Sequence, residues 1–397
     1  MNILPVLAPV LVFGLVVFVH ELGHFLAAKA VGVYAPVFSL GWGRRIWGFR
    51  RGETDYRLSL FPLGGYVRMA SREDEAMSTF EGGTERGNIA DDKAEPRGEP
   101  GVPWDPEALM PFGPRPVPWT RWFESKPLWA KVFVLLAGVA MNFALAIALV
   151  MALVMTEGVS NPAPLIGSVL PGSAAAAAGL QPGDLILTID DAPIGVWKEM
   201  VAAVTVKPGV PLRFSVRRAG APVAITLTPA ATVDTNPRTG VVRTLGRIGA
   251  VGSRITLGPV PAFLEAVRGT WETVVETVGV VGGLIRGNVS PKQLGGPIMI
   301  VQASVQRAQN SGLEGVLDLL ALISVNIAVL NLLPVPVLDG GQIVLAVIES
   351  VRGRPLGDRA RGLVMYAGVA VVLLLLITTT FNDVARIGGQ MLEHFRG

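Results

Sequence analysis

The sequence contains no cysteine among its 397 residues. Disulfide bonds and thiolate metal ligands are therefore excluded, and cysteine usage says nothing about the redox compartment. Charged residues make up only 16% of the chain, and the formal net charge is +3. No run of lysine and arginine alternates with aromatic residues, so we expect no nucleic-acid partner. Histidine is rarer still, with three residues in the whole chain.

What the sequence has in abundance is apolar residues. Half of the chain is hydrophobic and the mean hydropathy is +0.49, which is typical of an integral membrane protein that carries some soluble mass. Four segments are long enough to span about 30 Å of hydrocarbon. They cover residues 7–31, 132–155, 321–333 with a continuation at 342–348, and 363–381. A cleaved signal peptide is not expected, because the N-terminus lacks a basic region and the first apolar segment contains the candidate site described below.

The basic residues near the segment ends predict the orientation. Residues 1–10 carry no charged side chain, whereas four arginines follow the first segment and four lie between the third and the fourth. They are Arg44, Arg45, Arg50 and Arg51, and Arg352, Arg354, Arg359 and Arg361. We therefore expect both termini on the outer (periplasmic) side of the membrane and these two basic loops in the cytoplasm.

The long outer loop contains a soluble domain. The stretch "PLIGSVLPGSAAAAAGLQPGDLILTIDDAPI" alternates strand and turn patterns, and "LRFSVRR" and "VAITLTP" continue with further strands. This resembles a PDZ domain of the bacterial, circularly permuted kind. The resemblance implies an α+β domain that binds an extended peptide, for example a peptide C-terminus, at a sheet edge. We expect that groove at Leu165, Ile166, Gly167, Ser168 and Val169. A spacer domain without a ligand is the alternative.

The opening apolar segment contains the chemistry, in the stretch "FVHELGHFLAAKA". His20 and His24 are four residues apart, so on a helix they lie on one face and can bind one metal ion. Glu21 can take a proton from a water molecule that the metal activates. This is the spacing of a zinc hydrolase. The alternative is that both histidines only form hydrogen bonds with neighbouring helices. Placing polar groups in hydrocarbon without a function costs considerable free energy.

Asp339, in "NLLPVPVLDGGQ", is the expected third ligand. Pro334 and Pro336 break the helix there, which is tolerated at membrane depth only where the backbone lines a cavity. A helix N-cap is the other interpretation of this aspartate, and the two are compatible. His394 follows the last span and is expected on the opposite side of the membrane. At 1.5 Å per residue, His20 and His24 lie roughly 20 to 25 Å into the bilayer, and Asp339 reaches a similar level.

With these motifs the sequence resembles the site-2 protease family of intramembrane zinc proteases, and within it the bacterial regulator-of-sigma-E branch. The likeness covers nearly the whole chain and includes "VHELGHF", "YRLSLFPLGGYVRM", "LAGVAMNF", "LGGPIMI" and "NLLPVPVLDGG". It implies that His20, His24 and Asp339 hold one Zn²⁺ per chain and that Glu21 is the general base. Asn331 matches a position that handles substrate.

The resemblance also implies a re-entrant β-hairpin over residues 56–69, with "FPLGG" as its turn. Its substrate-facing residues would be Tyr56, Leu58, Leu60, Gly64, Gly65, Val67 and Met69. A transmembrane helix must be unwound before its peptide bonds can be hydrolysed, and pairing with a strand would hold it open. Residues 270–287 resemble the family's interfacial helix, whose apolar face suits a bilayer surface. The chain departs from that branch in having one PDZ domain instead of two and a longer cytoplasmic insert.

The resulting fold prediction is a polytopic α-helical membrane protein with about four transmembrane helices, a re-entrant β-hairpin and one outer PDZ domain. Its expected parts are the first span with the hairpin (1–70), a charged cytoplasmic linker (71–127), the second span (128–156) and the PDZ domain (160–256). An amphipathic helix and connector (257–312), the third span (313–350) and the fourth span with the tail (351–397) follow.

The predicted function is proteolysis within transmembrane segments of single-span proteins already trimmed on the outer side, in the bacterial inner membrane. The active site would lie near the cytoplasmic side. One alternative is a catalytically silent, membrane-anchored protein whose PDZ domain binds partners. A metal-ion transporter is the other, but it would need polar groups on several spans, and the fourth segment carries no charge.

Overall fold

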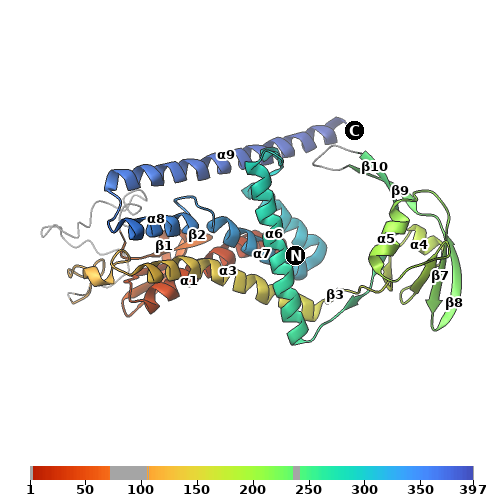
Figure 1. Cartoon of the computed structure of the whole chain (residues 1–397), viewed down its shortest axis with the longest axis horizontal. Helices are drawn as coiled ribbons and strands as arrows, with labels where there is room; N and C mark the ends of the chain where they lie inside the picture. The colour runs from red at the N-terminus through yellow and green to blue at the C-terminus, as the bar shows by residue number, and fades with distance from the viewer. Residues whose placement is uncertain (1–2, 72–104, 106, 236–241, 397) are drawn as a thin grey trace. The chain divides into compact units, whose positions relative to one another are not determined.

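The computed structural model describes residues 3–71, 105, 107–235 and 242–396 (Figure 1). Its contacts divide the chain into two compact units. The first unit combines Met1–Val150 with Ala266–Gly397 and holds the long apolar helices. The second unit is Met151–Glu265 and holds most of the short strands.

Four helices of the described chain are long and apolar enough to cross a membrane. They are α1 (Leu4–Ala30), α3 (Leu128–Thr156), α7 (Pro297–Asn331) and α9 (Asp358–Arg396). Runs of leucine, alanine and valine favour these helices, and each matches one of the segments predicted from hydropathy. The prediction of four apolar helices is confirmed.

Helix α7 is interrupted near its middle and ends at the predicted break. Gly312 has φ 58° and ψ −138°, values that kink the helix. Arg307 and Asp318 form an ion pair of 2.5 Å across this kink. After Asn331 the prolines of "PVPVL" prevent further helix, because proline lacks the amide donor. The chain resumes as α8 (Asp339–Arg352), which begins at the predicted ligand.

Helices α1, α3 and α7 form the core of the first unit. Ala8, Val12 and Val16 of α1 are fully buried against Leu319 and Leu320 of α7, and residues of α3 pack on the same cluster. Gly23 brings α1 close to α3, since a Cβ at this position would collide with the carbonyl group of Ala137. This close approach determines which side chains of α3 reach the histidines.

A twisted antiparallel hairpin, β1 (Val37–Arg51) with β2 (Thr54–Arg68), packs beside α1. Gly52 (φ 62°) and Glu53 form its turn. This corrects the predicted hairpin, in which residues 56–69 supplied both strands and "FPLGG" the turn. In the structure "FPLGG" belongs to β2, and the partner strand is the stretch 37–51. Its arginines had suggested a basic loop, but alternating apolar residues and the Gly52 turn favour a strand.

The register of this sheet distinguishes an inner segment from an edge. Leu58 is paired with both Leu40 and Trp47, so its backbone has neighbours on two sides. Val67 is paired with Phe38 alone, and residues 65–68 therefore form an edge among the described strands. Trp47 and Phe61, farther along the same strands, are more than half exposed. The sheet thus has an edge at residues 65–68 that is unpaired among the described strands, and exposed apolar side chains at Trp47 and Phe61.

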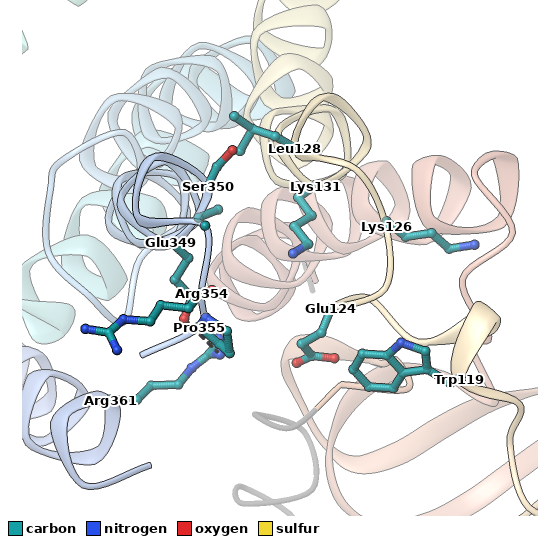
Figure 2. A pocket seen from close by; sticks show the side chains of 12 residues that line it. Trp119, Glu124, Lys126, Leu128, Lys131, Glu349, Ser350, Arg354, Pro355 and Arg361 are labelled. Atoms are coloured by element: carbon teal, nitrogen blue, oxygen red, sulfur yellow. Dashed lines mark ion pairs between the residues drawn. The ribbon is translucent and has the colours of Figure 1, made fainter. Parts of the chain in front are cut away.

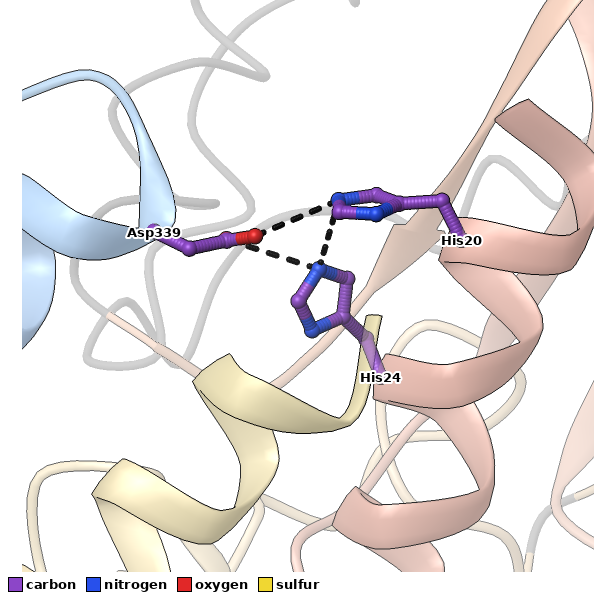
Figure 3. A group of neighbouring side chains, drawn as sticks. All are labelled: His20, His24 and Asp339. Carbon is purple, nitrogen blue, oxygen red and sulfur yellow. Dashed lines mark hydrogen bonds and ion pairs between the residues drawn. The ribbon is translucent and has the colours of Figure 1, made fainter. Parts of the chain in front are cut away.

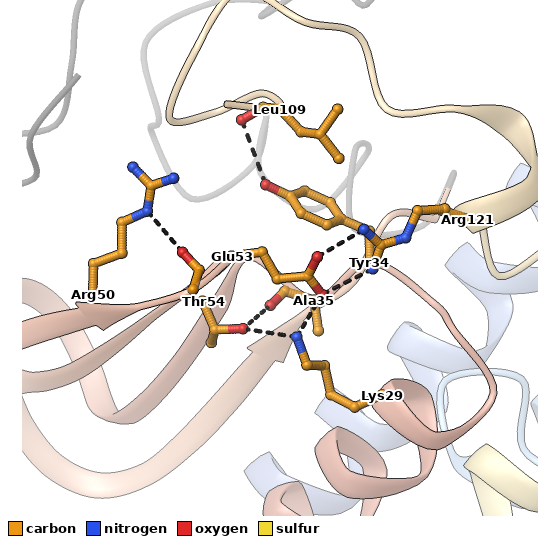
Figure 4. A network of polar contacts seen from close by, with 9 residues as sticks. Lys29, Tyr34, Ala35, Arg50, Glu53, Thr54, Leu109 and Arg121 are labelled. Carbon is orange, nitrogen blue, oxygen red and sulfur yellow. Dashed lines mark hydrogen bonds and ion pairs between the residues drawn. The ribbon is translucent and has the colours of Figure 1, made fainter. Parts of the chain in front are cut away.

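Polar contacts attach the hairpin turn to α1 and to the segment that precedes α3 (Figure 4). The Glu53 carboxylate accepts hydrogen bonds from Lys29 at 2.5 Å and from Arg121 at 2.7 and 2.8 Å. Burial favours the neutral form of Glu53, but these hydrogen bonds outweigh it and hold its pKa below the usual range. Burial, together with the Glu53 carboxylate, raises the pKa of Tyr34 to about 12. The hairpin is therefore held at its turn as well as along α1.

The second unit contains short antiparallel sheets around its own core. Its largest sheet has the order β6-β5-β7-β8, and three further pairs are β10-β9, β11-β4 and β12-β3. The strands are β3 (Val159–Ser160), β4 (Ile166–Val169), β5 (Leu185–Ile189), β6 (Ala192–Pro193), β7 (Leu212–Arg218), β8 (Ala221–Leu227), β9 (Ala230–Thr235), β10 (Val242–Arg247), β11 (Ala250–Gly252) and β12 (Arg254–Ile255). Helices α4 (Ala174–Ala177) and α5 (Trp197–Thr205) complete it.

The core of this unit includes Phe214 from β7 and Met200 from α5, both at most 2% exposed. Asp184 lies in the turn before β5, and its carboxylate accepts two hydrogen bonds from the Arg218 guanidinium at 2.7 and 2.8 Å. These bonds hold the pKa of Asp184 below its usual range despite its burial. This ion pair fixes the "GLQPGD" turn to the largest sheet.

Helix α6 (Pro259–Ile285) has one packed face and one apolar exposed face. Thr277 donates a hydrogen bond to Asn326 of α7 at 2.7 Å, and Val274 packs against buried residues of α7. On the other face Trp271 is 66% exposed and Val275 and Val278 are 54% exposed. The short helices η1 (Trp119–Arg121) and η2 (Pro291–Gln293) lie in the connecting segments.

Helix α9 is largely exposed, and its contacts include the start of α7 and the loop before α8. The buried carboxylate of Asp383 accepts hydrogen bonds from the backbone N–H groups of Gly296 and Met299, at the start of α7. Gly368 lies against Val337, in the loop before α8. A cavity of about 350 Å³ lies between the start of α3 and the end of α8, with Lys131, Glu124 and Glu349 in its lining (Figure 2).

Candidate active site

Helix α1 presents the two histidines as its sequence predicts. His20 and His24 are one turn apart and each is only 7% exposed. Their rings are perpendicular, with centroids 4.6 Å apart, and the two Nε2 atoms are separated by 3.1 Å. Both Nε2 atoms therefore face one small volume.

Asp339 approaches the same volume from the first turn of α8 (Figure 3). Its Oδ2 atom lies 3.3 Å from Nε2 of His20, and its Oδ1 atom lies 3.4 Å from Nε2 of His24. Leu338, not Asp339, occupies the N-cap position, so the carboxylate does not serve as a helix cap. Gly340 and Gly341 make the approach possible, because a side chain at either position would collide with the backbone of Leu332 or Val335.

The donor set fits a zinc ion. Two imidazole nitrogens and one carboxylate oxygen lie within 4.8 Å of one another, which is the type and number of protein ligands in catalytic zinc sites. Oδ2 of Asp339 is buried and accepts no hydrogen bond from the described residues, so its remaining electron pairs are available to a cation. Within the described ranges this is the one cluster of three such donors.

Helix α3 contacts both histidine rings through residues on three successive turns. The backbone carbonyl of Val134 accepts a hydrogen bond from Nδ1 of His24 at 2.9 Å. Gly138, one turn later, leaves the space that the rings fill, since a Cβ there would lie 2.5 Å from Nε2 of His24. Asn142, a further turn along, lies 3.4 Å from Nδ1 of His20. None of these three residues was predicted for the site from the sequence, although Asn142 is the one amide side chain in an otherwise uncharged apolar run.

Glu21 and Asn331, the other residues assigned from sequence, also reach this region. Glu21 follows His20 on α1, and its carboxylate accepts a hydrogen bond from the backbone of Val67 in β2. The side-chain amide of Asn331, at the end of α7, lies 3.1 Å from Nε2 of His20. Gly65 also lies beside Glu21, because a Cβ on Gly65 would be 3.8 Å from Glu21 Cγ. The edge of the sheet and the His-His-Asp cluster thus meet at Glu21.

The remaining predicted residues are distributed along β2 and in the second unit. Tyr56 packs in an aromatic group with Phe25 and Phe38, Leu58 lies in the inner segment, and Leu60 is 52% exposed. Met69 follows the end of β2 and packs against α1. Four residues of the predicted peptide groove, Ile166–Val169, form β4, which pairs with β11. Leu165 precedes β4 and bridges to Leu185.

Comparison with known proteins agrees with this geometry. Residues 8–375 match the model of peptidase family M50. The protein Atu1380 of Agrobacterium fabrum is 33% identical over 389 residues, which cover 96% of this chain and 95% of that protein. The zinc metalloprotease RasP of Geobacillus kaustophilus is 31% identical over 415 residues, covering 95% and 97%. The regulator of sigma-W protease RasP of Bacillus subtilis is 29% identical over 425 residues, covering 96% and 98%.

Together with these matches, the four apolar helices and the buried His-His-Asp cluster identify a membrane metalloprotease. The chain belongs to peptidase family M50, the site-2 protease family of zinc metalloproteases. It is accordingly a multi-pass membrane protein whose family acts on membrane-protein substrates.

Proposed function

We propose that this protein hydrolyses peptide bonds within the transmembrane segments of single-span proteins already trimmed on the outer side. One zinc ion per chain would be held by His20, His24 and Asp339. The observation that carries the proposal is the meeting of these three ligands, Glu21 and a sheet edge between apolar helices. A hydrolytic site buried in this way suits a substrate that is itself buried in the bilayer.

Each residue of the site has a distinct task. Bound zinc supplies Lewis acidity, which polarises a substrate carbonyl and makes a water molecule more acidic. Glu21 accepts the proton of the attacking water and then delivers a proton to the leaving amine. The amide of Asn331, 3.1 Å from Nε2 of His20, is close enough to hydrogen-bond the substrate backbone next to the scissile bond.

Residues 65–68 of β2 are proposed to hold the unwound substrate. Among the described strands they are paired on one side only, and Glu21 contacts the same stretch. A substrate strand added there brings its peptide bonds next to the general base. Exposed Trp47 and Phe61 suit contact of the sheet with lipid or with apolar substrate side chains.

The second unit is proposed to be the PDZ domain that admits trimmed substrates, with a peptide groove near Leu165–Val169. Because β4 is already paired with β11, a peptide there would use side-chain contacts along the groove more than new backbone pairing. Both termini and this unit are proposed to lie on the outer side of the bacterial inner membrane. The exposed apolar face of α6 would rest on the outer bilayer surface.

Removing and restoring the metal tests the proposal. Purified protein in detergent is treated with a chelator, dialysed, and supplied with one equivalent of zinc or with magnesium. A single-span model substrate and a soluble extended peptide report cleavage. The proposal expects one zinc per chain, loss of cleavage on chelation and recovery with zinc alone. Protein that binds substrate but cleaves neither substrate at any zinc level would favour the silent binding protein instead.

A further inference from the structure

Helix α3 contacts both histidine rings, as Asp339 does from α8. Nε2 of both rings faces Asp339, and Nδ1 of both rings faces α3. The acceptor for His24 is the Val134 carbonyl at 2.9 Å. The group at Nδ1 of His20 is the side chain of Asn142, two helical turns farther along. One helix thus supplies a polar neighbour to each ring, but only the neighbour of His20 is a side chain.

Asn142 is an unusual residue for its position. It is fully buried within an apolar helix, where a polar group without partners is costly. Ser324 of α7 donates to its backbone carbonyl at 2.8 Å, which fixes α3 against α7 at this level. Its side-chain Oδ1 atom has no hydrogen-bond partner among the described residues, while Nδ2 lies 3.4 Å from Nδ1 of His20. The amide therefore has one unused acceptor next to a metal-ligand histidine.

The chemistry of a neutral histidine ligand determines which atom of the Asn142 amide lies next to Nδ1 of His20. If Nε2 gives its electron pair to a metal, the ring proton is on Nδ1, and Nδ1 must donate to an acceptor. Rotation of the Asn142 amide by half a turn exchanges Oδ1 and Nδ2 and places the acceptor at Nδ1. His24 already has the equivalent arrangement with the Val134 carbonyl.

We propose that Asn142 is a positioning residue, whose Oδ1 atom accepts the Nδ1–H of His20 and so directs Nε2 of His20 at the metal. The proposal rests on the proposed zinc site and adds a residue that does not itself contact metal or substrate. It also explains why α3 carries an amide four residues after Gly138. Gly138 admits the rings, and Asn142 fixes the orientation of one of them.

The test measures zinc affinity by competition with a chromogenic chelator, in full-length protein in detergent. Asn142→Leu keeps the approximate volume but removes the acceptor, and we expect zinc affinity to fall about 10- to 100-fold. Asn142→Asp restores an acceptor and should keep affinity at or above that of the unmodified protein. Val139→Ala, a change at a buried α3 residue one turn before Phe143, controls for altered packing and should leave affinity unchanged.

A second readout separates orientation from folding. Cobalt substituted for zinc reports the ligand geometry through its visible absorption, which should change in Asn142→Leu and remain in Asn142→Asp. Unchanged zinc affinity and cobalt spectrum in a folded Asn142→Leu variant would overturn the proposal. A loss of zinc affinity of about 10- to 100-fold in a folded Asn142→Asp variant would also overturn it, because that variant retains the acceptor. This second result decides the question even if the leucine variant fails to fold. Absence of stoichiometric zinc in the unmodified protein would instead refute the proposed metal site.

Discussion

Gly138→Ala adds a single methyl group at the centre of the site. A Cβ built on Gly138 lies 2.5 Å from Nε2 and 2.7 Å from Cε1 of His24, and 2.9 Å from Cε1 of His20. Ordinary contacts of a Cβ begin at 3.4 Å, so relief of the closest contact needs a movement of about 0.9 Å, the difference from 2.5 Å. Metal–ligand distances tolerate only about 0.2 Å. The displaced rings therefore cannot keep the geometry that zinc requires.

The expected result is a loss of zinc affinity of about 100-fold or more, with loss of cleavage, in a protein that still folds. Alanine favours a helix interior over glycine by about 0.5–1 kcal/mol, so helix propensity does not oppose folding. Gly279→Ala in α6 is the matched control, because a Cβ there meets nothing within 4 Å. Zinc affinity is measured by chelator competition and folding by thermal unfolding. A Gly138→Ala protein with unchanged zinc affinity and cleavage would refute the geometry described for α1 and α3.

Three further changes test other parts of the account. Asp339→Asn should lower zinc affinity at least 10-fold, because a neutral amide is a poorer zinc ligand than a carboxylate; unchanged zinc stoichiometry and activity would mean that another residue is the third ligand. Val67→Pro should reduce cleavage of a helical transmembrane substrate more than cleavage of an extended peptide, because it removes an edge amide that also contacts Glu21. Leu58→Pro, in the inner segment, should instead lower thermal stability, and equal cleavage of both substrates by a folded Val67→Pro variant would exclude strand addition. Replacing residues 161–253 with a short Gly-Ser linker, between the paired strands β3 and β12, should keep hydrolysis and allow cleavage of untrimmed substrates; a folded, zinc-loaded but inactive variant would refute the gating role.

The apolar helices and the meeting of His20, His24 and Asp339 could be predicted from the sequence because their signals are local. Long apolar runs specify α1, α3, α7 and α9, and the spacing of His20 and His24 matches one helical turn. The signal for Asp339 is its place as an acidic residue next to the helix-breaking Pro334 and Pro336. In each case the signal lies in neighbouring residues: an apolar run, a pair of histidines four residues apart, or an aspartate next to prolines.

The hairpin and the support from α3 depend on contacts between distant residues. Strand β1 contains arginines and glycines that locally resemble a loop, and only its pairing with β2 makes it a strand. The roles of Val134, Gly138 and Asn142 follow from the close packing of α3 on α1, which Gly23 permits. The sequence signal available for Asn142 was its isolation as an amide in an apolar helix, and it could not identify His20 as the neighbour.

Glu21→Gln separates the proposed general base from the proposed zinc ligands. The substitution keeps the size of the side chain and all three proposed ligands, but it removes the group that accepts a proton. Zinc content and cleavage of a purified single-span substrate are measured on the same preparation, with the unmodified protein beside it. We expect one zinc per chain and cleavage reduced at least about 100-fold, in line with the contribution of a general base. Cleavage at the rate of the unmodified protein, with zinc bound, would contradict it.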